Sequence, residues 1–197
     1  MTIVVTLLAV LLQCSPALQQ QLQLQTPMRG WDLITGNLVH WSWNHLSWDL
    51  LVFLLAGLEV ERRIGARRTA WFLLGSALAV SSSVLILQSE LIPYRGLSGV
   101  VMGLCVLLTV QLFDRSRWAI ALIAVLLGKI LLECLTASTL FAAGAEYTVA
   151  PSAHLGGVLF GILWVALERK RSASSGDLGG LGWSCLGGCA PTACKPV

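Results

Sequence analysis

The chain has 197 residues, of which 56% are hydrophobic and only 12% are charged. This composition excludes a soluble globular domain and predicts one polytopic membrane domain. The formal net charge is +3. Because the arginines lie in short clusters between apolar runs, we expect the lipid bilayer, and no nucleic acid, as a partner.

Six apolar segments are long enough to cross a bilayer as helices, which takes about 20 residues each. In chain order they are 2–18, 42–58, 71–89, 97–113, 118–135 and 151–168. The expected fold is therefore an all-α polytopic membrane protein with six transmembrane helices. The first segment also resembles a signal peptide. It has no basic flank, and Ser15-Pro16-Ala17 is a weak cleavage-like site, so we expect it to be retained as a span.

Lysine and arginine are unevenly distributed between the connections. Nine of them follow the second, fourth and sixth segments: Arg62, Arg63, Arg67, Arg68, Arg115, Arg117, Arg169, Lys170 and Arg171. The connections on the other side carry only Arg29 and Arg95. Because cytoplasmic connections hold the excess of basic residues, both termini are expected to be cytoplasmic. The loops 19–41, 90–96 and 136–150 then lie outside.

The chain divides into three parts by composition. Residues 1–27 are expected to form the first helix and a linker, and residues 28–171 a core with the other five helices. Residues 172–197 are rich in glycine and serine and predict a disordered cytoplasmic tail. The spacing of its cysteines, Cys185, Cys189 and Cys194, matches no strong zinc signature. We expect neither a metal nor a cofactor.

Two polar residues lie a few positions inside long apolar runs, near the expected outer surface. Ser98 opens the fourth segment and His154 opens the sixth. An unpaired hydroxyl or imidazole is costly in a membrane and usually functional. A serine hydroxyl becomes a nucleophile when a base such as histidine removes its proton, so the pair predicts a Ser-His dyad. Hydrogen bonds within or between helices are the structural alternative for each residue.

Glycines occur at the spacing that allows two membrane helices to approach closely. Gly99 and Gly103 form one small-xxx-small pair, and Gly157 and Gly161 form another on the face that carries His154. Gly96 and Gly99 are further expected to relieve crowding around the nucleophile.

Five motifs in order give the chain beyond residue 28 a resemblance to rhomboid intramembrane serine proteases. They are Trp31 and Thr35 with His40; His45 at the start of the second span; Gly57 with Glu61-Arg62-Arg63-Ile64-Gly65; Gly96-Leu97-Ser98-Gly99; and His154 with Gly157 and Gly161. The resemblance implies a six-helix rhomboid-like bundle, with Ser98 as nucleophile and His154 as base. It also implies that His45 donates a hydrogen bond to the oxyanion.

The short core with six spans and the motif Arg95-Gly96-Leu97-Ser98-Gly99 most resemble the rhombosortase branch. This likeness implies a bacterial inner-membrane enzyme with its site open to the periplasm. The implied substrate is an exported membrane protein, cleaved near a Gly-Gly motif before its C-terminal transmembrane tail.

Two residues depart from the family pattern. Asp32 stands where arginine is common, so the bracing of that loop is expected to differ. Asp49 stands four residues after His45, where asparagine is expected. An ionised carboxylate cannot donate a hydrogen bond to an oxyanion. Two alternatives stay open: Asp49 is protonated, or it turns away and orients a neighbour such as His45.

Other polar residues have structural interpretations first. His40 is expected to pack within the outer loop, and Lys129 with Glu133 to form an ion pair within the fifth span. A catalytically inactive rhomboid-like protein that binds membrane clients is the alternative function, and the change at Asp49 favours it. A channel is disfavoured because most of the candidate catalytic polar groups cluster on one side of the membrane.

Overall fold

A computed structural model describes residues 1–112, 128 and 150–174 of the chain. Within these ranges every regular element is a helix, and the predicted all-α class is confirmed for this part of the chain. The elements are α1 (Thr2–Gln13), α2 (Pro16–Leu22), α3 (Asp32–Thr35), α4 (Trp43–Ile64), α5 (Ala66–Leu87), the 3₁₀ turn η1 (Ser89–Leu91), α6 (Ser98–Leu112) and α8 (Pro151–Ser174).

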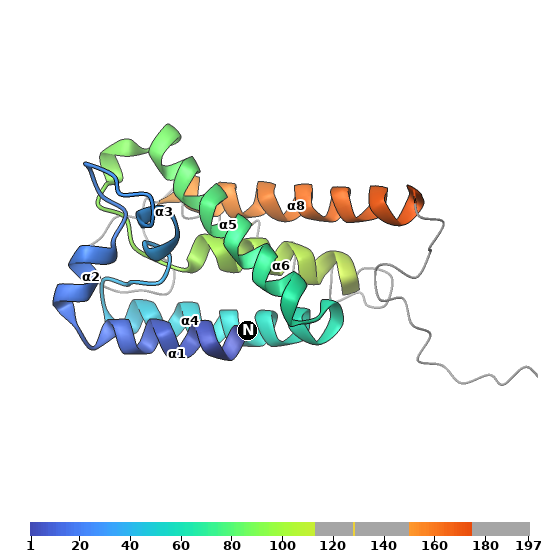
Figure 1. Cartoon of the computed structure of the whole chain (residues 1–197), viewed down its shortest axis with the longest axis horizontal. Coiled ribbons are helices and arrows are strands. Elements are labelled where there is room, and N and C mark those ends of the chain that lie inside the picture. Colours follow the sequence, from blue (N-terminus) through green and yellow to red (C-terminus); the bar gives the residue numbers. More distant parts are fainter. Residues whose placement is uncertain (113–127, 129–149, 175–197) are drawn as a thin grey trace, which may run out of the picture.

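Helix α6 lies at the centre of the described bundle. It contacts α8 on one side and α4 on the other, while α5 packs on both α6 and α8, and α1 runs along α4 (Figure 1). The α6 side chains are apolar all round and buried, among them Val100, Leu104 and Leu107. A helix of this kind belongs in the interior. Its first residue is therefore held by neighbours on several sides.

The expected spans are recovered in part. Among the described residues, α5 and the stretch Pro151–Arg171 of α8 are long and apolar enough to cross a membrane. Helices α1 and α2 reach that length only as a pair bent by 116°. The expected first span 2–18 is therefore not straight. The break has a local cause, since Pro16 opens a new helix and the Ser15 hydroxyl caps it.

The ends of the other helices also differ from the apolar runs. Helix α4 continues past residue 58 to Ile64, because Glu59 accepts hydrogen bonds from Arg62 and Arg63 along its polar last turns. Helix α8 continues to Ser174, into the expected tail. The fifth expected span, 118–135, and the remainder of the tail lie outside the described residues, so the count of six helices stays a prediction.

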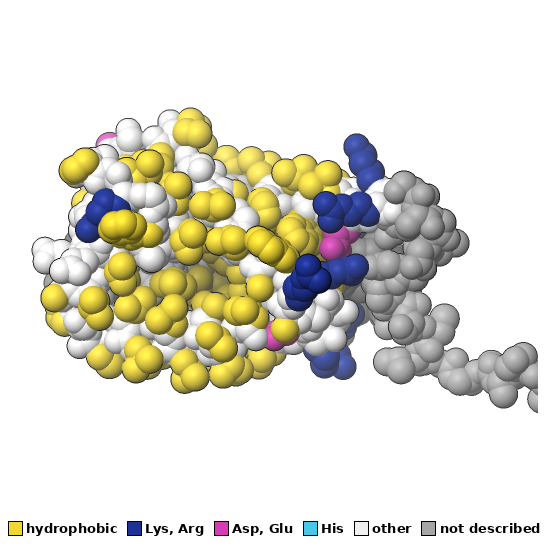
Figure 2. All heavy atoms as spheres, in the orientation of Figure 1, with side chains coloured by type: hydrophobic (Ala, Val, Ile, Leu, Met, Phe, Trp, Pro, Cys, Tyr) yellow, Lys and Arg dark blue, Asp and Glu magenta, His cyan; other side chains and the backbone are white. Residues whose placement is uncertain are grey.

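Basic residues of three helices gather at one end of the bundle, next to a face on which hydrophobic side chains are widespread (Figure 2). They come from the end of α4, the start of α5 and the end of α8: Arg62, Arg63, Arg67, Arg68, Arg169, Lys170 and Arg171. The start of α1 lies at the same end, where Met1 N is 2.5 Å from Glu61 Oε1. The positions of Ser98 and His154 are at the opposite ends of α6 and α8.

Helices α6 and α8 touch through backbone at four glycines. A Cβ atom built on Gly157 would lie 1.8 Å from the Gly99 carbonyl oxygen, and one on Gly103 would lie 2.8 Å from the Gly157 oxygen. A Cβ on Gly161 would lie 2.9 Å from the Gly103 oxygen. These separations leave no room for a methyl group. The helix axes can cross this closely only because these positions carry no side chain.

We predict that Gly157→Ala strongly destabilises the bundle. Its methyl group would overlap the Gly99 carbonyl, and overpacking of this kind costs about 1–3 kcal/mol or more. The measurement is thermal unfolding in detergent, with an expected decrease of several degrees or more. Gly30→Ala is the matched control, because a Cβ there meets nothing within 4 Å. An unfolding temperature equal to that of the control would contradict the close crossing.

Candidate active site

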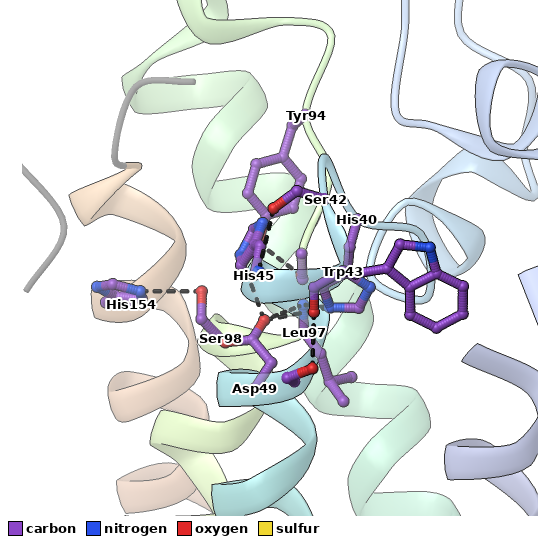
Figure 3. A network of polar contacts seen from close by, with 11 residues as sticks. His40, Ser42, Trp43, His45, Asp49, Tyr94, Leu97, Ser98 and His154 are labelled. Carbon is purple, nitrogen blue, oxygen red and sulfur yellow. Dashed lines mark hydrogen bonds and ion pairs between the residues drawn. The ribbon is translucent and has the colours of Figure 1, made fainter. Parts of the chain in front are cut away.

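Ser98 and His154 meet across the α6–α8 crossing. Ser98 is the first residue of α6, and His154 lies in the first turn of α8, directly before the glycine contacts. The distance from Ser98 Oγ to His154 Nε2 is 3.0 Å (Figure 3). His154 is only 4% exposed. The two predicted site residues are thus within hydrogen-bond distance, although 56 positions separate them.

This contact has the geometry of a nucleophile and its base. A neutral imidazole has one protonated and one unprotonated ring nitrogen. With the proton on Nδ1, Nε2 accepts the Ser98 O–H and can take its proton as the oxygen attacks.

The turn before Ser98 is held by its backbone groups. Gly96 has φ +141°, a conformation that favours glycine. Its N–H donates to the Gly36 carbonyl at 3.1 Å, and its carbonyl accepts the Tyr94 hydroxyl at 3.0 Å. A Cβ on Gly96 would also lie 3.1 Å from His45 Cε1. Glycine is required here both by the backbone conformation and by the imidazole that packs against it.

Tyr94 stays a hydrogen-bond donor in this turn. Its burial, and then the negative charge of Asp49, raise the pKa of the Tyr94 phenol well above its ordinary value. The phenol is therefore protonated at any physiological pH, and its hydrogen bond to the Gly96 carbonyl does not depend on pH in this range.

Asp49 lies at the centre of a cluster on the other side of this turn. Its Oδ2 atom is 3.1 Å from Leu97 N, 3.2 Å from His40 Nε2 and 3.4 Å from His45 Nε2 (Figure 3). His45 is placed by the start of α4, where its N–H donates to the Ser42 hydroxyl at 3.1 Å. Asp49 follows one turn later on the same face. The cluster therefore joins α4 to the residue that precedes Ser98.

His40, which we expected to pack within the outer loop, also contacts this cluster. It is completely buried, and its Nε2 lies 3.2 Å from both Asp49 Oδ2 and Leu97 N. Its ring also meets His45 edge-on, with centroids 5.1 Å apart. The small number of histidines was the one feature of the sequence that pointed to His40. The chain has only three histidines, and all three lie around Leu97 and Ser98.

Asp32 braces its loop in place of the arginine common in the family. Its side chain is fully buried, and Oδ2 accepts the Arg29 N–H at 3.0 Å. The loop is further tied to the bundle by Asn37, whose amide donates to Ser81 Oγ of α5 at 2.9 Å. The loop before α4 is therefore fixed from within and from α5.

The segment expected to be a linker contacts the nucleophile loop. Leu24 and Tyr94 exchange two backbone hydrogen bonds of 3.1 and 3.0 Å. The Arg95 guanidinium donates to Gln23 Oε1 at 3.0 Å and to Gln19 Oε1 at 3.2 Å, and lies 4.4 Å from the ring centre of Trp41. The N-terminal helices thus brace the turn that leads to Ser98.

Among the residues that the structure describes, no group of three or more His, Cys, Asp and Glu side chains could hold a metal ion. Lys129, Glu133 and the cysteines of the tail lie outside these residues.

A family model described as the rhomboid domain matches residues 27–171. No curated protein matches the chain. The chain therefore belongs to the rhomboid family, and this membership implies an intramembrane serine protease type of function. The family also includes inactive members. The match begins after α1 and α2, so the helices that brace the loop around Arg95 lie outside the family domain.

We predict that the Gln19→Ala, Gln23→Ala double variant loosens the nucleophile loop. It removes both hydrogen bonds to Arg95, each worth about 1–3 kcal/mol when the donor is charged. Amide hydrogen exchange at Tyr94 and Gly96 should become at least about 5-fold faster. Gln20→Ala is the control, because this α2 side chain is exposed. Unchanged exchange in the double variant would show that the N-terminal helices do not brace the loop.

Proposed function

We propose that this protein is an intramembrane serine endopeptidase with Ser98 as nucleophile and His154 as general base. The observation that carries the proposal is the 3.0 Å contact between Ser98 Oγ and His154 Nε2 in a chain of the rhomboid family. Proton transfer by a positioned histidine supplies about 10²–10⁴-fold in rate.

The proposed reaction has two halves. His154 Nε2 removes the Ser98 proton while Oγ attacks the substrate carbonyl carbon, which gives a tetrahedral oxyanion. His154 then returns the proton to the leaving amine as the peptide bond breaks, and an acyl-enzyme remains. Water attacks this ester, with His154 again as base, and releases the carboxylic acid and free Ser98.

The oxyanion needs hydrogen-bond donors at about 2.7–3.1 Å. The first backbone N–H groups of α6 are candidates, since they lack partners within the helix. The side chain of His45 is the second candidate, because it packs against Gly96, two residues from the nucleophile.

In this proposal the basic end of the bundle is cytoplasmic and Ser98 lies near the outer surface, open to the periplasm of a bacterial inner membrane. The substrate is a membrane-anchored exported protein. Its helix must unwind locally before a carbonyl reaches Ser98, and glycine lowers the cost of leaving a helix. Cleavage near a Gly-Gly motif before a C-terminal transmembrane tail is proposed on the likeness to rhombosortases.

A catalytically inactive protein that binds membrane clients is the second candidate function. Asp49 favours it, because a carboxylate replaces the amide expected beside the oxyanion. The two functions differ in whether Ser98 reacts.

We predict that a fluorophosphonate probe labels the protein at Ser98. Labelling should be lost in Ser98→Ala and fall about 10²-fold or more in His154→Gln, because the base is removed. Ser89→Ala, an exposed serine at the same end of the bundle, should label normally. Equal labelling of native protein and Ser98→Ala, or none under conditions that label an active rhomboid, would favour the client-binding function.

The substrate class is tested separately. Co-expression with an exported protein that carries Gly-Gly before a C-terminal transmembrane tail should release its soluble part, and Ser98→Ala should not. Immunoblotting of the periplasmic fraction measures the release. If the native protein is labelled but this substrate stays intact, the proposed Gly-Gly specificity is wrong and the proposed protease function stands.

A further inference from the structure

The carboxylate of Asp49 is unexpected beside a site that stabilises negative charge. We propose that Asp49 is a positioning residue: it holds His45 with a proton on Nε2, and it does not itself donate to the oxyanion. This inference rests on the proposed function and deepens it, since it assigns the oxyanion donor of the side-chain cluster to His45.

The first step is that Asp49 is anchored as an acceptor. The Leu97 N–H is an obligatory donor and lies 3.1 Å from Oδ2. His40, which is completely buried, places Nε2 at 3.2 Å from the same oxygen. An ionised carboxylate can only accept, and one of its oxygens can accept from several donors. The Leu97 N–H also lies 3.2 Å from His40 Nε2, so both groups donate to Oδ2 when His40 carries its proton on Nε2. In that tautomer their convergence on a single atom fits a carboxylate.

The second step is that the anchored oxygen selects the tautomer of His45. A carboxylate beside one ring nitrogen keeps the proton on that nitrogen. Asp49 Oδ2 faces Nε2 of His45, four residues earlier on the same face of α4. The ring is confined between this carboxylate and Gly96, where a Cβ would lie 3.3 Å from Nε2. His45 is therefore oriented with its Nε2–H toward the nucleophile turn.

The third step concerns the length of this contact. The 3.4 Å from His45 Nε2 to Asp49 Oδ2 exceeds the 2.7–3.2 Å usual for an N–H···O hydrogen bond. Leu97 N and His40 Nε2 are both closer to the same oxygen. The carboxylate therefore lies beside the Nε2 proton, and its stronger contacts are to the other two groups. In the proposal the same Nε2–H is donated to an oxyanion at Ser98.

A double-mutant cycle tests whether Asp49 acts through His45. The rate of fluorophosphonate labelling is measured for native protein, Asp49→Ala, His45→Gln and the double variant. We expect Asp49→Ala to slow labelling about 10-fold or more, and to slow it less than about 2-fold when His45 is already replaced. Glu90→Ala, an exposed carboxylate at the same end, should be neutral. The proposal would be overturned if the two single reductions in labelling rate multiplied in the double variant. It would also be overturned if Asp49→Ala left the labelling rate unchanged.

A second measurement does not depend on activity and is made on the native protein, with one variant used for assignment. Because the chain has three histidines, ¹⁵N-histidine labelling gives three ring systems, and His45→Gln identifies that of His45. When its ring is neutral, the spectrum should show the proton of His45 on Nε2. A ring protonated only at Nδ1 would overturn the proposal, whether or not the protein labels.

The two failures are distinguishable. Absence of labelling in the native protein, with His45 still protonated at Nε2, would remove the proposed protease function and with it the oxyanion role. Normal labelling with His45 protonated only at Nδ1 would keep the protease and reject Asp49 as its positioning residue.

Discussion

The backbone contact between α6 and α8 is the constraint on which the candidate site depends. Membrane helices gain little from the hydrophobic effect when they associate, so close packing must hold them together. Here Gly157 lies directly on the Gly99 carbonyl, and the next residue before Gly99 is Ser98. The hydroxyl and the imidazole can therefore approach to 3.0 Å without a long side chain on either helix. The short distance between Ser98 and His154 is thus a consequence of glycines at the crossing, which carry no side chain.

A second requirement comes from the irregular backbone beside the nucleophile. Polar backbone groups at membrane depth must find partners within the protein. The turn before α6 meets this requirement through three other parts of the chain: Leu24 pairs with Tyr94, Gly36 accepts from Gly96, and Asp49 of α4 accepts from Leu97. Tyr94 itself holds the Gly96 carbonyl. The N-terminal segment outside the family domain thus contributes to the rigidity of the turn.

Within the part of the chain that the structure describes, apolar runs were sufficient to predict helices but not their ends. The first apolar run breaks at Ser15, because the Ser15 cap and Pro16 start a new helix. Helix α4 extends beyond the end of its apolar run, because Glu59 accepts hydrogen bonds from Arg62 and Arg63. The proximity of Ser98 and His154 followed from their similar depth and the glycine spacing. The contact of His40 with Asp49 could not be predicted, since it depends on the path of the loop 31–42. Helical periodicity placed Asp49 near His45, yet said nothing of Leu97.

The α6–α8 crossing also limits how a protein chain can reach the nucleophile from the lipid. Separation of these two helices would part the hydroxyl from the imidazole, so the proposed protease would need this wall of the bundle to stay shut while Ser98 reacts. The substrate of such a protease would then reach Ser98 from the lipid through a different wall of the bundle, or from the outer surface.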